Sequence, residues 1–396
     1  MRRRAFLTGA AAALSAPLWA GRADPGYWER VFARLPPHLA DVAFDPEHQV
    51  QLLCVRVERA TDGPTRYRRF AHGLAPRRWF STGSVIKLPM ALLMAERVSL
   101  HRLDAGASVV LHAPPATGEW PDGEPLAEPF ARGLARTFAV SDNAPYNRWY
   151  EYLGADAMHA RLAELGYPHA RLIARLGSTD AAANRRSGGG ELKTAAGETM
   201  ETRAPASARE RCFPFGAAFG GRAWQHDDGT ISDGPRDFSR ANFLPLEDSL
   251  AMLQAFLAPD SVPAWRRWRI DGALRAQLLR ALALRPRDSV DPRYSESTHP
   301  DGYARWFFVG GSRERLAPSI TVFGKSGMAY GYLSEVAWVV DREQGAEFLL
   351  GASIYANRDG VLNDDRYDYE RIGLPFLRAV GAAVLEMERE LRRRRS

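Results

Sequence analysis

The chain has 396 residues, of which 45% are hydrophobic, so it is long enough for one large packed domain or two ordinary ones. Its formal net charge is +6, but residues 1–23 contain four arginines and positions 392–395 are four more. The body between these ends is close to neutral, which argues against a nucleic-acid-binding surface. No apolar run beyond the N-terminus reaches the length of a transmembrane helix.

Positive charge comes almost entirely from arginine: the chain has 50 Arg and only three Lys, namely Lys87, Lys193 and Lys325. A lysine can lose its proton when it is desolvated, whereas an arginine stays protonated. The three lysines are therefore the cations to inspect for proton-transfer chemistry. The two cysteines, Cys54 and Cys212, leave open whether they form a disulfide.

Residues 1–23 have the pattern of a targeting segment. Arg3 and Arg4 form a twin-arginine pair before a small apolar run, and Ala20 or Ala23 precedes the expected cut. The twin-arginine route predicts export to the periplasm or beyond. A disordered basic tail is the alternative.

The mature chain begins with a short predicted helix at 27–35. Alternating apolar residues then predict strands at 49–59 and 65–70, joined by a turn at 61–64. An apolar helix follows Ser84, and residues 101–170 read as mostly helical. Helical periodicity returns at 244–257 and 270–284.

Two polar stretches interrupt this pattern, one at 178–242 and one at 286–318. We call the first the polar excursion, and its glycines and aspartates predict loops and hairpins. Its run His226-Asp227-Asp228 lacks a second histidine at ligand spacing, so no metal site is expected.

The C-terminal part predicts strands at 320–323, 332–340 and 346–355, then a long helix at 369–391. The expected fold is therefore α/β, of the α+β kind, with a sheet built from both chain ends. Residues 24–396 form one predicted domain, with an α/β part at 24–90 and 319–396. A helical part with insertions, at 91–318, lies between them.

Ser84 and Lys87 form a Ser-x-x-Lys pair at the start of an apolar helix. If the helix begins near Ser84, both side chains lie on one face, one turn apart. A neutral lysine there can take the serine proton and make it a nucleophile. A helix-capping serine beside a solvated lysine is the plainer alternative.

Two later motifs favour the nucleophilic serine over the helix-capping one. Ser141-Asp142-Asn143 lies between two predicted helices, where a helix cap is the alternative. Lys325-Ser326-Gly327 follows a strand, where a surface lysine at a strand end is the alternative. Three such motifs in this order and setting are much less probable by chance than any one of them.

With these motifs the sequence resembles the penicillin-recognising serine hydrolases, and the class A β-lactamases most. The 57 residues from Ser84 to Ser141 are close to the usual spacing of that family, whereas the 184 from Ser141 to Lys325 are many more. The two polar stretches can supply the excess. The resemblance implies a β-lactamase/transpeptidase-like fold with an antiparallel sheet and an inserted helical lobe.

The resemblance also implies roles for the site residues. Ser84 would be acylated with the help of Lys87, and Ser141 would relay a proton to the leaving nitrogen. Asn143 would hold the substrate's side-chain amide, while Lys325 and Ser326 would attract its carboxylate. The backbone N–H groups of Ser84 and of Met328, which follows Gly327, would form the oxyanion hole.

One part of the family pattern is missing. Class A enzymes carry a glutamate that activates the deacylating water, and by spacing it belongs near Gly177, where no acid stands. Asp180 is the nearest acid, and three glutamates of the polar excursion are further candidates: Glu191, Glu198 and Glu201. Acylation is therefore expected, and efficient deacylation is not assured.

These observations predict an exported serine hydrolase that acts through an acyl-enzyme on β-lactams or related amides and esters. A D-alanyl-D-alanine peptidase or esterase is the near alternative. A slowly deacylating periplasmic penicillin-binding or sensor module is the second. The expected partner is a small β-lactam or a cell-wall-peptide-like molecule, with no nucleic acid, cofactor or metal. The oligomeric state is left open.

Overall fold

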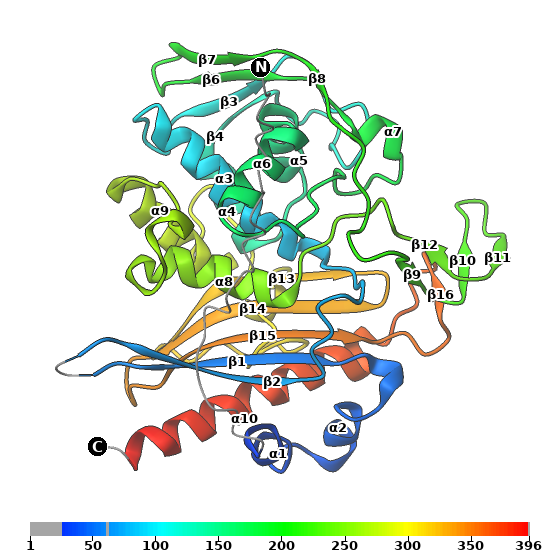
Figure 1. Ribbon diagram of the computed structural model, residues 1–396, viewed down its shortest axis with the longest axis vertical. Coiled ribbons are helices and arrows are strands. Elements are labelled where there is room, and N and C mark those ends of the chain that lie inside the picture. Colours follow the sequence, from blue (N-terminus) through cyan, green and yellow to red (C-terminus); the bar gives the residue numbers. More distant parts are fainter. Residues whose placement is uncertain (1–25, 61–62, 395–396) are drawn as a thin grey trace, which may run out of the picture.

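A five-stranded antiparallel sheet forms the centre of the computed structural model, which describes residues 26–60 and 63–394 (Figure 1). The predicted targeting segment lies outside the described residues. The sheet has the order β13-β14-β15-β1-β2. Its strands are β1 (Gln51–Glu58), β2 (Arg66–His72), β13 (Ile320–Ala329), β14 (Tyr332–Asp341) and β15 (Glu347–Tyr355). Both chain ends contribute to it, as the sequence predicts.

The register of the sheet follows from burial on both faces. β1 lies between β15 and β2, so that Cys54 pairs with Leu350 on one side and with Phe70 on the other. β14 and β15 are buried along nearly their whole length. A strand covered on both faces reads as a near-continuous apolar run, as these do, and a slip of one residue would turn every side chain to the wrong face.

The N-terminal helices and the last helix cover one face of the sheet (Figure 1). They are α1 (Tyr27–Phe32), α2 (Pro37–Val42) and α10 (Leu374–Arg393), and a π-helical turn, Tyr369–Gly373, leads into α10. Tyr27 stacks on Phe70 at 3.9 Å, and its hydroxyl donates to Glu388 at 2.9 Å. Arg56 of β1 also donates to Glu388, so this buried carboxylate ties α10 to the sheet.

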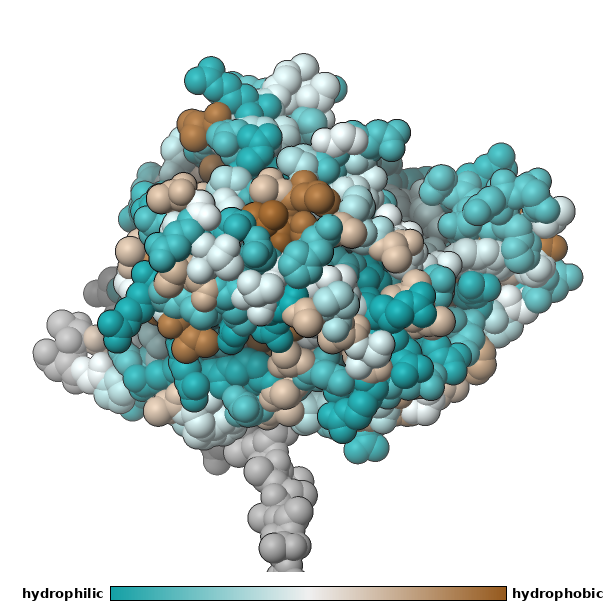
Figure 2. Space-filling view, turned by 90° about the horizontal axis from the view of Figure 1, so that it is seen from above, coloured by the Kyte–Doolittle hydropathy of each residue, from teal (hydrophilic) through white to brown (hydrophobic). Residues whose placement is uncertain are grey.

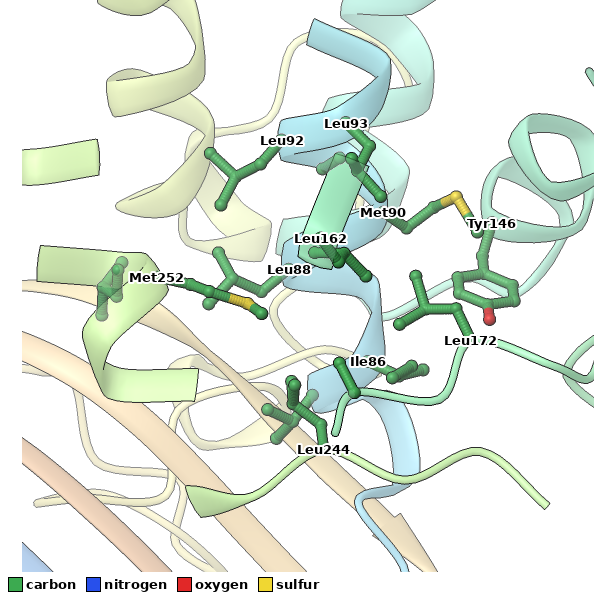
Figure 3. Packing of buried hydrophobic residues seen from close by; sticks show 14 of the residues in the cluster. Ile86, Leu88, Met90, Leu92, Leu93, Tyr146, Leu162, Leu172, Leu244 and Met252 are labelled. Carbon is green, nitrogen blue, oxygen red and sulfur yellow. The ribbon is translucent and has the colours of Figure 1, made fainter. Parts of the chain in front are cut away.

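The other face carries the helical lobe, with α3 at its centre. The lobe contains α3 (Lys87–Leu100), α4 (Phe130–Ala139), α5 (Ala144–Leu153), α6 (Ala155–Glu164), α8 (Leu246–Leu257) and α9 (Gly272–Leu282). Apolar side chains leave α3 in several directions and meet residues such as Tyr146, Leu172 and Met252 (Figure 3). Residues 87–95 of α3 are all buried, and this burial in the core holds the start of the helix in place.

The start of α3 corrects one expectation. Ser84 lies in a 3-10 turn, Gly83–Ile86, and the α-helix begins only at Lys87. β13 packs against this turn from the sheet side. The tighter 3-10 turn still places residues three apart nearly above one another.

Residues 101–170 contain more than helices. β3 (Ser108–Leu111) and β4 (Ala127–Pro129) join β6 (Gly190–Lys193) and β7 (Thr199–Arg203) in a four-stranded sheet of order β4-β3-β6-β7. Each of the first two strands is at most four residues long, too short for its periodicity to stand out from the neighbouring helices.

The polar excursion consists of loops, hairpins and short elements, as predicted. Besides β6 and β7 it holds α7 (Ala181–Asn184), β5 (Arg186–Ser187), β8 (Ala206–Ser207), β9 (Phe219–Gly220), β10 (Ala223–Gln225), β11 (Ile231–Asp233) and β12 (Arg236–Asp237). An antiparallel backbone bridge between Arg171 and Phe243 joins the segments that flank the excursion. β10 pairs in parallel with β16 (Val361–Leu362) and anchors the second half beside the main sheet.

The stretch 286–318 contains two 3-10 turns, Pro286–Asp288 and Asp301–Tyr303. Three further 3-10 turns are Pro46–His48, Pro259–Ser261 and Ala264–Arg266. Cys54 is buried and Cys212 is exposed, and both are free thiols. Among the described residues no helix combines the length and apolar character that a membrane span requires.

Candidate active site

The turn that carries Ser84 is pressed against strand β13. Gly83 has φ +46°, and a Cβ atom there would lie 2.6 Å from the Met328 backbone nitrogen. A Cβ atom at Gly327 would lie 2.4 Å from the Ser84 nitrogen. Contacts this close allow only glycine at both positions. The backbone nitrogens of Ser84 and Met328 are thereby brought to neighbouring positions beside the Ser84 hydroxyl.

Both predicted site lysines converge on one serine. Lys325 Nζ donates to Ser141 Oγ at 2.9 Å, and Lys87 Nζ lies 3.2 Å from the same oxygen. Lys87 also donates to the backbone carbonyl of Ser141. Within the described chain the Ser84 hydroxyl has no hydrogen bond, so proton transfer to Lys87 requires the amine to turn from Ser141 toward Ser84.

Burial sets the protonation of these lysines. Both side chains are fully buried, and burial disfavours the charged form. It lowers the pKa of Lys87 to about 7, although the negative charges of Asp142 and Glu119 oppose the shift. Burial, then the positive charges of Lys87 and Arg305, hold the pKa of Lys325 well below its usual range. A neutral amine is therefore accessible next to Ser84 near neutral pH.

The Ser141 turn is strained and held by charges. Ser141 has φ +63°, a left-handed conformation that costs a non-glycine residue about 1 kcal/mol. Arg136 donates to the Asp142 carboxylate at 2.8 Å, and Asp142 accepts from the Ala144 N–H at 2.9 Å. The N-cap residue of α5 is Asn143, and no side chain caps that helix, so the predicted cap is absent. Asp142 fixes the turn instead, and Ser141 faces the lysines.

Asn143 faces a residue that the sequence motifs do not indicate. Its Nδ2 donates to Glu119 Oε2 at 2.6 Å. Asn147, one turn further along α5, donates to the backbone carbonyls of Glu119 and Leu176 and accepts from the Leu176 N–H. One buried amide thus joins the Glu119 loop to the segment around Leu176.

A cavity of about 310 Å³ opens at Ser84. The turn of Ser84, Asn143, the segment 174–179, the second half of the polar excursion and the end of β13 line it. No acid occurs in 174–179, as the sequence indicates. The carboxylates that line the cavity are Glu119 and Asp237.

The glutamates of the polar excursion do not supply the missing acid. Glu201 accepts hydrogen bonds from Arg97, His101 and Tyr152, and Glu191 pairs with Lys193. Neither these two nor Glu198 lines the cavity, and Asp180 caps α7 instead. None of these candidates therefore contributes an acid to the cavity lining. Glu191, Glu198 and Glu201 lie on the β6–β7 hairpin, which joins the strand pair β3–β4 on the far side of the lobe (Figure 1).

The remaining motif residues divide into two groups. Met328 lines the cavity and is 44% exposed. Lys325 and Ser326 are buried behind it, and the Ser326 hydroxyl donates to the Ala304 carbonyl at 2.9 Å. The 286–318 stretch therefore covers the side of the site at which a substrate carboxylate is expected.

The third lysine has an ordinary setting. Lys193 Nζ forms an ion pair with Glu191 at 2.8 Å and donates to Thr199 at 2.7 Å on the β6–β7 hairpin.

The sequence motifs do not indicate Glu119, because it stands in a loop with no motif around it. Its relation to Asn143 exists only through the fold.

Part of the chain matches a known protein family. Residues 68–204 match a family described as the beta-lactamase enzyme family. A search of curated proteins found no match. The matched stretch includes Ser84, Lys87, Ser141 and Asn143.

Solved structures with a similar chain path include β-lactamases and a protein called PBP-A. The β-lactamase of Sphaerobacter thermophilus DSM 20745 is 15% identical, with 91% of this chain and 97% of that one covered and a TM-score of 0.47. The β-lactamase of Desulfarculus baarsii DSM 2075 is 16% identical, with 88% of this chain and 96% of that one covered and a TM-score of 0.46. PBP-A is 15% identical, with 92% of this chain and 98% of that one covered and a TM-score of 0.48.

The family match and the sheet built from both chain ends confirm the predicted fold class and the predicted resemblance. The chain is similar to the β-lactamase-like serine hydrolases.

Proposed function

We propose that the protein is a serine hydrolase that forms an acyl-enzyme at Ser84 with β-lactams or related amides and esters. One observation carries the proposal: the Ser141 hydroxyl accepts a hydrogen bond from Lys325 and lies within reach of Lys87, whose amine has a pKa of about 7. Acyl transfer to serine needs a base and a proton relay, and this cluster supplies both.

In the first half-reaction Lys87 takes the Ser84 proton as Oγ attacks the substrate carbonyl carbon. The oxyanion accepts hydrogen bonds from the N–H groups of Ser84 and Met328. The C–N or C–O bond then breaks, and Ser141 passes its proton to the leaving atom while Lys87 or Lys325 replaces that proton. Asn143 holds the amide of the acyl side chain.

In the second half-reaction water must attack the ester, and a base must take its proton. We assign this role to Glu119, because it lines the cavity with Ser84 and is fixed through Asn143 and Asn147. Asp237 is the weaker candidate, since its carboxylate accepts the N–H and hydroxyl of Ser239.

A D-alanyl-D-alanine peptidase or esterase is one alternative function, and a slowly deacylating penicillin-binding sensor is the other. The absence of an acid from 174–179 favours slow release of a β-lactam acyl group, which both alternatives allow. Turnover separates the hydrolase from the sensor: a hydrolase consumes many equivalents of a chromogenic β-lactam or ester, and a sensor only one.

Intact mass after incubation with benzylpenicillin tests both. We expect one adduct of the mass of the antibiotic on the protein, located at Ser84 by peptide mapping, and none on Ser84→Ala. An unmodified wild-type protein that also leaves benzylpenicillin intact would refute the acyl-enzyme proposal, because a protein that releases the acyl group quickly carries no adduct but consumes the antibiotic.

We further propose export by the twin-arginine route to the periplasm or beyond, with 24–396 as one catalytic domain. The support is Arg3, Arg4 and the small apolar run after them. The proposed substrates, β-lactams or related amides and esters, are small molecules.

A further inference from the structure

The cavity at Ser84 contains an arginine whose charge is not matched by an acid. Arg236, from β12, lines the cavity, and its guanidinium lies 4.5 Å from the centre of the Trp224 ring. Within residues 26–60 and 63–394 its side chain forms no ion pair or hydrogen bond. The two other arginines of the cavity are paired, Arg240 with Glu210 and Arg175 with Glu151.

Arg236 stands at one end of a row of aromatic rings that reaches the Ser84 segment. Trp224 and Tyr330 are 5.7 Å apart between ring centres, and Tyr330 and Phe238 are 5.1 Å apart. Phe238 stacks on Trp79 at 4.2 Å with an interplanar angle of 10°. We call this row of four rings the aromatic wall.

The wall is held by backbone pairing. Trp224 lies on β10, which pairs with β11 on one side and with β16 on the other. The Phe238 N–H donates to the Ala218 carbonyl at 2.7 Å. The β10–β11 part of the polar excursion projects beside the main sheet, and its outer surface is mostly hydrophilic (Figures 1 and 2). Trp224 lines the cavity, so the strand pairing of β10 holds its ring on the cavity side in a preorganised arrangement.

The position of the wall relates it to the acyl part of a substrate. Asn143 and Met328, which would hold the acyl amide and the oxyanion, line the same cavity. Lys325 and Ser326, assigned to the carboxylate on the leaving side, do not. The wall thus lies on the acyl side of the scissile bond.

We propose that Arg236 and the aromatic wall form a subsite for an acyl group that carries a carboxylate next to a flat apolar group. A guanidinium can stack on an indole and still offer its N–H edge to a carboxylate in bidentate fashion. The neighbouring rings exclude water and strengthen that pairing. This inference rests on the proposed acyl-enzyme chemistry, and it gives the second half of the polar excursion a function.

Benzylpenicillin and carbenicillin test the subsite, because they differ only by a carboxylate on the acyl side chain. The second-order rate constant for acylation of Ser84 is measured for both with the wild type and with Arg236→Gln. We expect the carbenicillin-to-benzylpenicillin ratio to fall about tenfold in the variant, the loss of one charge-assisted contact. Added salt should lower the wild-type ratio but not that of the variant.

Arg240→Gln is the matched control, since Arg240 also lines the cavity but is neutralised by Glu210, and we expect it to keep the wild-type ratio. An unchanged ratio in Arg236→Gln would overturn the subsite while leaving the acyl-enzyme intact. Equal losses for both substrates would overturn it too, because they indicate a structural role. If Arg236→Gln does not fold, Arg236→Lys should lower the ratio severalfold, and a wild-type ratio there counts against the proposal. No acylation by either compound would refute the proposed function itself.

Discussion

The protonation of Lys87 gives the sharpest prediction, because burial alone changes it by orders of magnitude. An exposed lysine, with pKa about 10.4, is neutral in roughly one molecule in 2,500 at pH 7. The pKa of about 7 that burial gives Lys87 makes about half of the molecules neutral at that pH. The general base is therefore available without a histidine.

The rate constant for Ser84 acylation should reflect this pKa. Below pH 7 it should fall about tenfold per pH unit as Lys87 becomes protonated, and above pH 8 it should level off. Lys87→Arg keeps the positive charge but cannot lose its proton, so we expect a loss of roughly a thousandfold or more. Stopped-flow acylation from pH 5 to 9 measures both.

The same pKa makes a prediction about stability. The native-state pKa of Lys87 lies below the unfolded value, so the unfolded chain binds more protons between pH 7 and about 10. Burying the charged form of Lys87 lowers the free energy of unfolding. This destabilisation has its maximum value below pH 7 and disappears above about pH 10. On this basis it is about 4 kcal/mol at pH 7 and about 2 kcal/mol at pH 9.

Lys87→Met, which has similar volume and no charge, removes that cost. The difference in unfolding free energy between variant and wild type should shrink by roughly 2 kcal/mol from pH 7 to pH 9, measured by urea denaturation. An acylation rate that is flat from pH 5.5 to 8, together with a pH-independent stability difference, would refute the argument. A fully active Lys87→Arg protein would make Lys87 a structural residue.

The remaining predictions concern Ser84, Gly327 and Glu119. Ser84→Ala should lower steady-state hydrolysis by roughly a thousandfold or more, and residual activity near wild type would mean a different nucleophile. Gly327→Ala should lower the unfolding free energy by ~1–3 kcal/mol and also the acylation rate, because its Cβ would meet the Ser84 nitrogen; unchanged acylation would contradict the close approach. Glu119→Gln, which can still accept from Asn143, should leave the burst of acylation but slow release at least tenfold, and unchanged release would remove Glu119 as the base.

Much of the fold follows from local sequence patterns. Four strands of the central sheet lie within a few residues of the prediction, since their apolar periodicity is long and regular. The fifth, β13, was predicted to end at residue 323 but runs to Ala329, so the Lys325 motif lies within the strand and not after it. The helix α2 was not predicted. The short strands β3 and β4 were missed, and the start of α3 moved from Ser84 to Lys87. Both differences arise where a tertiary partner, β6 or β13, decides the local backbone.

The sequence by itself determined the residue types and the order of the three motifs, because Ser84 and Lys87 are three residues apart and need no fold to be neighbours. Only the tertiary structure brought Ser141 and Lys325, 184 positions apart, to one hydroxyl. It also decided the pKa of Lys87, which depends on burial, and which glutamate lines the cavity, namely Glu119 and not Glu191, Glu198 or Glu201. Desolvation and cavity lining are properties of packing between distant segments, and spacing along the chain does not encode them.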